Sequence, residues 1–127
     1  MFPVRILIVD EHPEVLNRIE TRLSQEDGFE LVGTASNGAQ AISIAKETNP
    51  EIVLIDPIMQ DGSGMIAIKE FRDQLPIASI VVLTAFVDTS TRVELEKAGV
   101  FSILVKGIDT GILVKTLTDI KNSRENN

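Results

Sequence analysis

The sequence predicts an α/β fold in which a parallel sheet is doubly wound, with helices on both faces. Five short apolar runs recur at intervals of about 23 to 27 residues, and segments with helical periodicity separate them. The runs cover residues 4–9, 30–35, 52–55, 80–83 and 102–105. Three are nearly continuous in Val, Ile and Leu, which is typical of parallel strands covered on both faces. Because strand and helix alternate, right-handed crossovers give a single sandwich.

The first two helices have clear start and stop signals. Pro13 suits the first turn of a helix, and the apolar residues after it recur at helical spacing. This predicted face consists of Val15, Leu16, Ile19 and Leu23. Asn37 can cap a second helix, and Pro50 stops it before the third strand. Its apolar residues are Ala41, Ile42 and Ala45.

The last three helices differ in the apolar surface that they offer. A helix that begins near Ser63 and ends before Pro76 presents Met65, Ile68, Phe71 and Leu75. A helix over residues 88–98 is poor in apolar residues, so we expect the weakest attachment to the core there. Gly99 suits its left-handed C-terminal cap. The last helix should bury Ile112, Leu113, Leu117 and Ile120, and we expect the polar tail 121–127 to fray.

Composition limits the classes of function open to the chain. With 127 residues and a net charge of −7, it is one acidic globular domain. It has no Cys and a single His, which excludes disulfides, thiolate catalysis, cysteine-ligated zinc and multi-histidine metal sites. No apolar run approaches the ~20 residues of a membrane span, and no basic stretch favours nucleic-acid binding. We therefore expect a cytoplasmic protein without membrane contact, which reaches DNA only through another domain.

Polar residues end four of the five predicted strands. The functional crevice of an open α/β sheet lies at the carboxyl ends of its strands, so these residues should meet there. They are Asp10 with Glu11, Asp56, Thr84 and Lys106, whereas the second strand ends in Ala35 and Ser36.

This polar set suits the transfer of a phosphoryl group. Asp10, Glu11 and Asp56 place up to three negative charges in one pocket, and a hard divalent cation, best Mg²⁺, would compensate them. Lys106 offers a point charge and Thr84 a hydroxyl donor for phosphate oxygens, while an Asp can accept phosphate covalently. Each residue taken singly has an ordinary structural explanation. Together they predict a phosphoryl-transfer site.

Five stretches of the sequence carry a family resemblance. They are Ile6 to Pro13, Ser36 to Ala41, Ile52 to Asp56 with Met59 and Gly64 after it, Val81 to Ala85, and Ala98-Gly99 leading to Lys106. In this order and spacing they resemble a response-regulator receiver domain of bacterial two-component signalling, over residues 4 to about 120. The resemblance implies a flavodoxin-like, or receiver-like, (βα)5 sandwich of five parallel strands in the order 2-1-3-4-5.

The resemblance also assigns roles to the site residues. Asp56 would accept phosphate from a sensor histidine kinase, or slowly from acetyl phosphate, and the domain would assist this reaction without being a turnover enzyme. Mg²⁺ would be held by Asp10, Glu11, Asp56 and the backbone carbonyl of Ile58. Lys106 would pair with the phosphoryl group and Thr84 would swing in to bond it. Ala85 would leave that group reachable and donate its N–H.

Phosphorylation would then change the conformation of the surface formed by the fourth helix, fifth strand and fifth helix. Through this surface receivers form homodimers or bind an output domain. The Asp-Glu-His-Pro start and the lack of Pro after Lys106 resemble receivers that precede LuxR-like helix-turn-helix output domains. We therefore expect a receiver over residues 1–122, with 123–127 as a polar tail that starts a linker toward a missing output domain. The alternative, a receiver that stands alone, stays open.

Several positions depart from the family pattern. Ile103 stands where receivers usually have Tyr or Phe, the ring that moves inward as Thr84 engages phosphate. Phe86 and Phe101 lie near enough in sequence to substitute, and this choice stays open. Gln60 stands where Pro commonly follows the Met, and Gly107 where Pro often follows the Lys.

Two further departures surround the acceptor itself. Pro57 directly follows Asp56 and removes one N–H. Ile58 and Phe86, two residues past Asp56 and Thr84, are both apolar. They cannot orient an attacking water, which predicts a slowly decaying phosphoryl-aspartate.

Other functions stay open at this point. A pseudo-receiver that binds its partner constitutively would explain Ile103. A Mg²⁺-dependent phosphatase would need a general acid two residues after its Asp nucleophile, where Ile58 stands. A flavodoxin-like cofactor binder would need a phosphate-binding loop after the first strand, and the sequence has none. His12 fits the start of the first helix better than a catalytic role.

Overall fold

The computed structural model describes residues 2–107 and 109–125. Over these ranges five strands alternate with five helices, as the apolar runs predict. The strands are β1 (Val4–Val9), β2 (Phe29–Ala35), β3 (Ile52–Ile55), β4 (Ser79–Thr84) and β5 (Ser102–Val105). The helices are α1 (Pro13–Ser24), α2 (Gly38–Thr48), α3 (Ser63–Gln74), α4 (Thr89–Lys97) and α5 (Thr110–Glu125).

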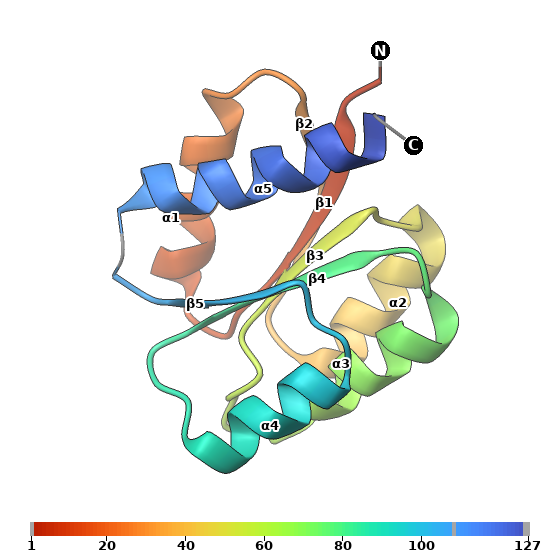
Figure 1. The fold of residues 1–127 in the computed structure, drawn as a ribbon, viewed down its shortest axis with the longest axis vertical. Helices are drawn as coiled ribbons and strands as arrows, with labels where there is room; N and C mark the ends of the chain where they lie inside the picture. The colour runs from red at the N-terminus through yellow and green to blue at the C-terminus, as the bar shows by residue number, and fades with distance from the viewer. Residues whose placement is uncertain (1, 108, 126–127) are drawn as a thin grey trace.

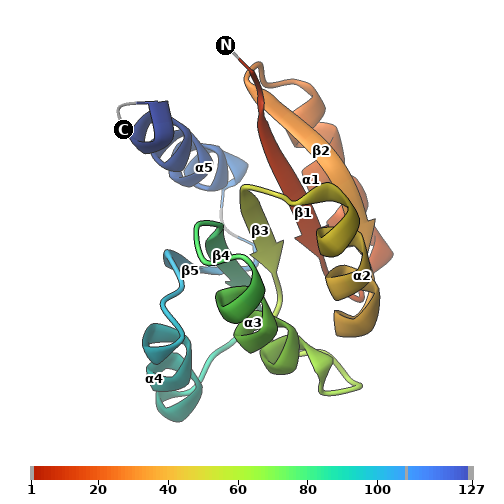
Figure 2. The same cartoon turned by 90° about the vertical axis from the view of Figure 1, so that its right-hand side faces the viewer.

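The strands form one parallel sheet in the order β2-β1-β3-β4-β5, which confirms the predicted topology. Figure 2 shows the strands from β2 at one edge to β5 at the other. Backbone hydrogen bonds extend the alignment past the strand ends. Asp10 N–H donates to Ala35 O at 3.0 Å, Asp56 N–H to Val9 O at 3.1 Å, and Lys106 N–H to Thr84 O at 2.7 Å. The residues that follow the strands are therefore fixed along one edge of the sheet.

Helices cover both faces of the sheet and bury two separate cores. Figure 1 shows α1 and α5 on one side and α2, α3 and α4 on the other. The core under α2, α3 and α4 includes Leu7, Val9, Ala41, Phe71 and Leu95. The core under α1 and α5 includes Ile6, Ile8, Ile19 and Leu117. Because β1 supplies side chains to both cores, its sequence is continuously apolar.

The predicted helix boundaries are confirmed by the contacts at the helix ends. Asn37 Oδ1 accepts the backbone N–H of Gln40 at 2.9 Å and so caps α2. Gly99 follows α4 with a φ of +78°, the left-handed conformation expected of a C-terminal cap. The buried residue of α4 is Leu95, so this helix is weakly anchored, as expected. No helix in the described part of the chain has both the length and the apolar character that crossing a bilayer requires.

One prediction for α5 is wrong. Leu113, Leu117 and Ile120 are buried as expected, but Ile112 is 52% exposed. Adjacent residues of a helix point about 100° apart. With Leu113 directed at the core, Ile112 therefore turns toward solvent.

The C-terminal part of α5 also differs from the expectation. Residues 121–125 were expected to fray, but the helix continues through Glu125. The guanidinium of Arg124 donates to the carbonyl oxygen of Glu51 at 2.8 Å and to that of Ile77. These contacts to the starts of β3 and β4 hold the last turn. Residues 126 and 127 of the predicted tail lie outside the described residues.

Candidate functional site

Two buried carboxylates lie side by side at the carboxyl edge of the sheet. Asp10 directly follows β1 and Asp56 directly follows β3, the neighbouring strand. Their exposed fractions are 2% and 3%. Burying two carboxylates is costly unless a cation or hydrogen-bond donors compensate them. The site therefore requires a positive charge at this point.

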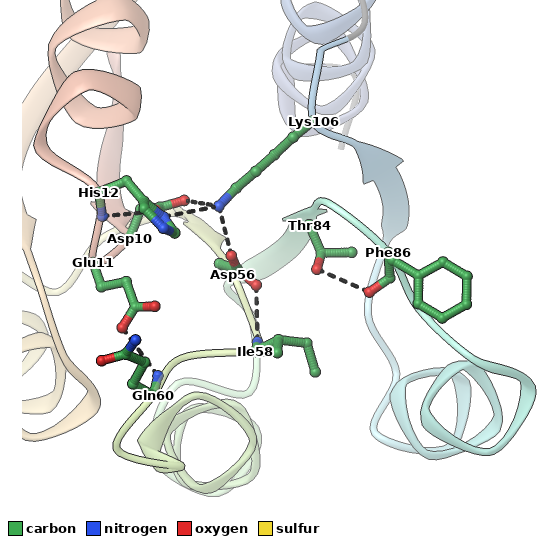
Figure 3. A network of polar contacts seen from close by, with 9 residues as sticks. All are labelled: Asp10, Glu11, His12, Asp56, Ile58, Gln60, Thr84, Phe86 and Lys106. Atoms are coloured by element: carbon green, nitrogen blue, oxygen red, sulfur yellow. Dashed lines mark hydrogen bonds and ion pairs between the residues drawn. The ribbon is translucent and has the colours of Figure 1, made fainter.

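Lys106 supplies that charge from the loop after β5. Its Nζ lies 2.6 Å from Asp56 Oδ2 and 2.8 Å from Asp10 Oδ2 (Figure 3). Desolvation by burial lowers the pKa of the Lys106 ammonium, but the hydrogen bonds to Asp10 and Asp56 together with their negative charges outweigh it, and the net pKa is raised. Lys106 therefore remains protonated at neutral pH and bridges the two carboxylates.

His12 joins this pocket, although its position in the sequence predicts only a place at the start of the first helix. Its backbone N–H donates to Asp10 Oδ1 at 2.8 Å, and its Nδ1 lies 2.9 Å from the same oxygen. The ring nitrogen is also 3.4 Å from Lys106 Nζ. His12 does occupy the N-terminal cap position of α1, as predicted, but its side chain makes no capping hydrogen bond. The one available signal was its position two residues after Asp10.

The loop between β3 and α3 is shaped around Asp56. Asp56 Oδ1 accepts the backbone N–H of Ile58 at 2.8 Å. The first turn of α3 packs directly on this loop, because a Cβ at Gly64 would lie only 2.4 Å from Pro57 O and 2.8 Å from Asp56 O. Glycine is therefore required for the close approach of α3 to the acceptor backbone.

Glu11 is not brought together with the other two acids. Its Oε2 accepts the backbone N–H of Gln60 at 3.0 Å and so ties the end of β1 to the loop after β3. A Pro at position 60, common in the family pattern, would lack this N–H. One ligand atom each from Asp10, His12 and Asp56 lie within 4.8 Å of one another. This cluster contains two acids and an imidazole rather than three acids.

Thr84 lies in the site but faces a different partner. It is buried, and its hydroxyl donates to the carbonyl oxygen of Phe86 at 3.3 Å. Within the described residues, no hydrogen bond joins Thr84 to Asp56. Figure 3 shows the Thr84 hydroxyl aimed toward the Phe86 backbone. Ala85, which follows Thr84, is exposed.

The three candidates for the switch position differ in burial. Ile103 on β5 is half-buried and packs against the core under α2, α3 and α4. Phe86 and Phe101 are 74% and 52% exposed. Ile103 is therefore the candidate in contact with that core, whereas both aromatic rings face largely into solvent.

Known relatives agree with this architecture. VraR, a response regulator protein of Staphylococcus epidermidis, is 34% identical over 113 residues, which make up 89% of this chain and 50% of VraR. LiaR, a transcriptional regulatory protein of Bacillus subtilis, is 31% identical over 103 residues, or 81% of this chain and 49% of LiaR. The chain thus spans about half the length of these curated relatives.

Solved structures show the same fold. A LuxR-family two-component response regulator from Aurantimonas sp. SI85-9A1 superposes with a TM-score of 0.86 at 25% identity, covering 95% of this chain and 86% of that chain. A CheY-like response regulator receiver domain protein from Methanospirillum hungatei JF-1 gives a TM-score of 0.90 at 18% identity, with 98% of each chain covered. The sequence model of the response regulator receiver domain matches residues 6–118. With nearly its whole length matched, the chain belongs to the response regulator receiver domain family.

Proposed function

We propose that Asp56 is the phosphoryl acceptor of this receiver domain. The observation that carries the proposal is the buried Asp56 carboxylate, held 2.6 Å from the Lys106 ammonium and beside a second buried acid, Asp10. A carboxylate oxygen of Asp56 would form a bond to phosphorus as the bond from phosphorus to a donor histidine nitrogen breaks. The leaving imidazole keeps that electron pair and takes up a proton. Lys106 would stabilise negative charge on the transferring group.

The residues of the pocket fit Mg²⁺. Two buried carboxylates and a backbone carbonyl are the hard oxygen ligands that this ion prefers. Asp10, Asp56 and the carbonyl of Ile58 would hold it, and Glu11 would add its charge while tying the loop that carries Ile58. When bound, Mg²⁺ neutralises the carboxylates and the phosphoryl oxygens.

The switch would begin at Thr84. Its hydroxyl would exchange the Phe86 carbonyl for a phosphoryl oxygen, to which Ala85 N–H would also donate. Ile103 would change its packing against the core when Thr84 moves, and so would transmit the movement to β5. Moving α4 would require little free energy, because Leu95 is the one described residue of that helix that is buried in the core.

The surface of α4, β5 and α5 would carry the output. Large apolar side chains are exposed on and beside α4 and β5, namely Phe86, Val93, Phe101 and Val105. A second copy of the chain or an output domain could cover them. Size-exclusion chromatography with light scattering, before and after phosphorylation, would show whether the domain forms a homodimer through this surface.

The partners of the proposed function follow from the family. The phosphoryl donor would be a sensor histidine kinase in the cytoplasm. The matched residues make up only about half of each relative, which supports a LuxR-like DNA-binding output domain that follows the receiver. The receiver itself would not contact DNA. It is a signalling domain rather than a classical enzyme.

Intact-mass spectrometry after incubation with acetyl phosphate and Mg²⁺ tests the proposal. We expect the wild type to gain one phosphate, about 80 Da, and to lose this gain when EDTA is present. The Asp56→Asn variant should gain nothing. Equal modification of the variant, or no modification of the wild type, would refute the proposed acceptor and favour a constitutively binding pseudo-receiver.

A further inference from the structure

The Lys106 ammonium marks a cation position contacted by three groups. Its Nζ lies 2.6 Å from Asp56 Oδ2, 2.8 Å from Asp10 Oδ2 and 3.4 Å from His12 Nδ1. Figure 3 shows these groups converging on the ammonium from the ends of two neighbouring strands, β1 and β3, while Lys106 follows β5. A positive charge is therefore held where two carboxylate oxygens and a ring nitrogen meet.

His12 makes the ligand set of this position a mixed one. Carboxylate and carbonyl oxygens suit Mg²⁺, whereas imidazole suits Ni²⁺, Zn²⁺ and Cu²⁺. Asp10, His12 and Asp56 can each offer one ligand atom within 4.8 Å of the others. A pocket with an imidazole among its ligands gains affinity for these softer cations without losing the oxygens that bind Mg²⁺.

The backbone holds the imidazole beside the carboxylates. His12 sits at the start of α1, directly before Pro13, with φ −96° and ψ 111°. Its own N–H donates to Asp10 Oδ1, so the ring is anchored by its main chain and not only by its side chain. The His12 side chain is 47% exposed, while Asp10 is buried. The ring thus lies at the solvent side of the pocket, where a hydrated cation can reach it.

We propose that this pocket binds borderline divalent cations, of which Ni²⁺ is the probe, through His12 Nδ1 together with the Asp10 and Asp56 carboxylates. The imidazole is neutral in this state, with its proton on Nε2. The inference rests on the proposed function, since it concerns the same acceptor carboxylate. A bound Ni²⁺ competes with Mg²⁺ for Asp10 and Asp56 and takes the place of the Lys106 ammonium between them.

Isothermal titration calorimetry with NiCl₂ and MgCl₂ on the untagged chain tests the proposal. The chain has one His and no Cys, so His12 is the only imidazole and no thiolate competes. His12→Asn is the matched variant, because Asn is among the residues preferred at a helix N-terminal cap. His12→Ala is the second variant. We expect both to weaken Ni²⁺ binding at least about tenfold while Mg²⁺ affinity stays unchanged in His12→Asn.

Two further measurements locate the cation. Co²⁺-loaded wild type should show a hyperfine-shifted, exchangeable imidazole N–H in its ¹H NMR spectrum, and His12→Asn should lack it. Asp56→Asn should also weaken Ni²⁺ binding, since the proposed ion contacts both residues. Equal Ni²⁺ affinity in the wild type and both His12 variants would overturn the proposal. Ni²⁺ binding that is insensitive to Asp56→Asn would overturn it too, since the ion would then sit on an isolated surface imidazole.

This test is separable from that of the proposed function. His12-dependent Ni²⁺ binding without phosphate uptake from acetyl phosphate would leave the metal site standing and refute the acceptor role. Phosphate uptake with Mg²⁺, combined with unchanged Ni²⁺ binding in the His12 variants, would support the acceptor role and refute the metal site.

Discussion

The Gly64→Ala substitution should disturb the acceptor loop more than the size of one methyl group suggests. The added Cβ would lie 2.4 Å from the carbonyl oxygen of Pro57 and 2.6 Å from its carbonyl carbon. Ordinary van der Waals contact begins at 3.4 Å, so α3 and the loop must separate by about 1 Å, the scale of shift that overpacking imposes on a backbone. Both obstructing atoms belong to the backbone, and no rotation of a side chain relieves the clash.

The loop should give way before the helix does. Ile68 and Phe71 anchor α3 in the core with exposed fractions of 0% and 1%. The displaced segment therefore carries Pro57 and Ile58 away from Asp56. We expect a loss of about 1–3 kcal/mol of unfolding free energy, the usual cost of overpacking. A misplacement of this size near reacting atoms can also slow phosphorylation by up to about 100-fold.

Urea unfolding followed by far-ultraviolet circular dichroism measures the first effect, because the chain has no Trp or Tyr. The rate of mass gain with acetyl phosphate measures the second. Gly62→Ala is the matched control. Its Cβ would meet no atom within 4 Å, although a φ of +74° makes the substitution strained. The Gly62→Ala control should have a lower unfolding free energy than the wild type but the same rate of phosphorylation. If Gly62→Ala slowed the reaction as much as Gly64→Ala, the steric explanation would be wrong.

Three further predictions concern the site and its surroundings. The phosphoryl-aspartate should decay slowly, because the exposed side chains of Ile58 and Phe86 cannot orient water; a mass-spectrometric lifetime of seconds with Mg²⁺ would contradict this. Lys106 has a raised pKa, so its stabilisation is complete below the unfolded-state lysine pKa and is lost as the pH rises through the folded pKa. The unfolding free energies of wild type and Lys106→Met should therefore differ at pH 7, begin to converge above about pH 10.4 and become equal only above the raised folded-state pKa; a constant difference would refute the charge argument. Arg124→Ala should lose the bond to Glu51 O, cost about 1 kcal/mol and speed amide exchange in the last turn of α5; unchanged exchange would show that Arg124 does not hold that turn.

Local patterns determined most of the fold. Runs of Val, Ile and Leu mark the central strands because these strands are covered on both faces, and capping residues such as Asn37 mark the helix starts. Parallel strands align their carboxyl ends, so Asp10, Asp56 and Lys106 could be expected to meet from sequence position alone. The structure places them together as predicted.

Contacts between distant residues decided the rest. Arg124 extends α5 by binding the carbonyl of Glu51, 73 residues away in sequence. The pattern of residues in the polar C-terminal segment cannot predict a partner so distant in sequence. The direction of the Glu11 carboxylate depends on the N–H of Gln60, which a loop 49 residues later presents. The place of His12 in the pocket depends on the two buried carboxylates and on the lysine that folding brings beside it. Sequence spacing predicts which residues reach the carboxyl edge of the sheet. Which side chains bind one another at that edge depends on packing and electrostatics in the folded chain.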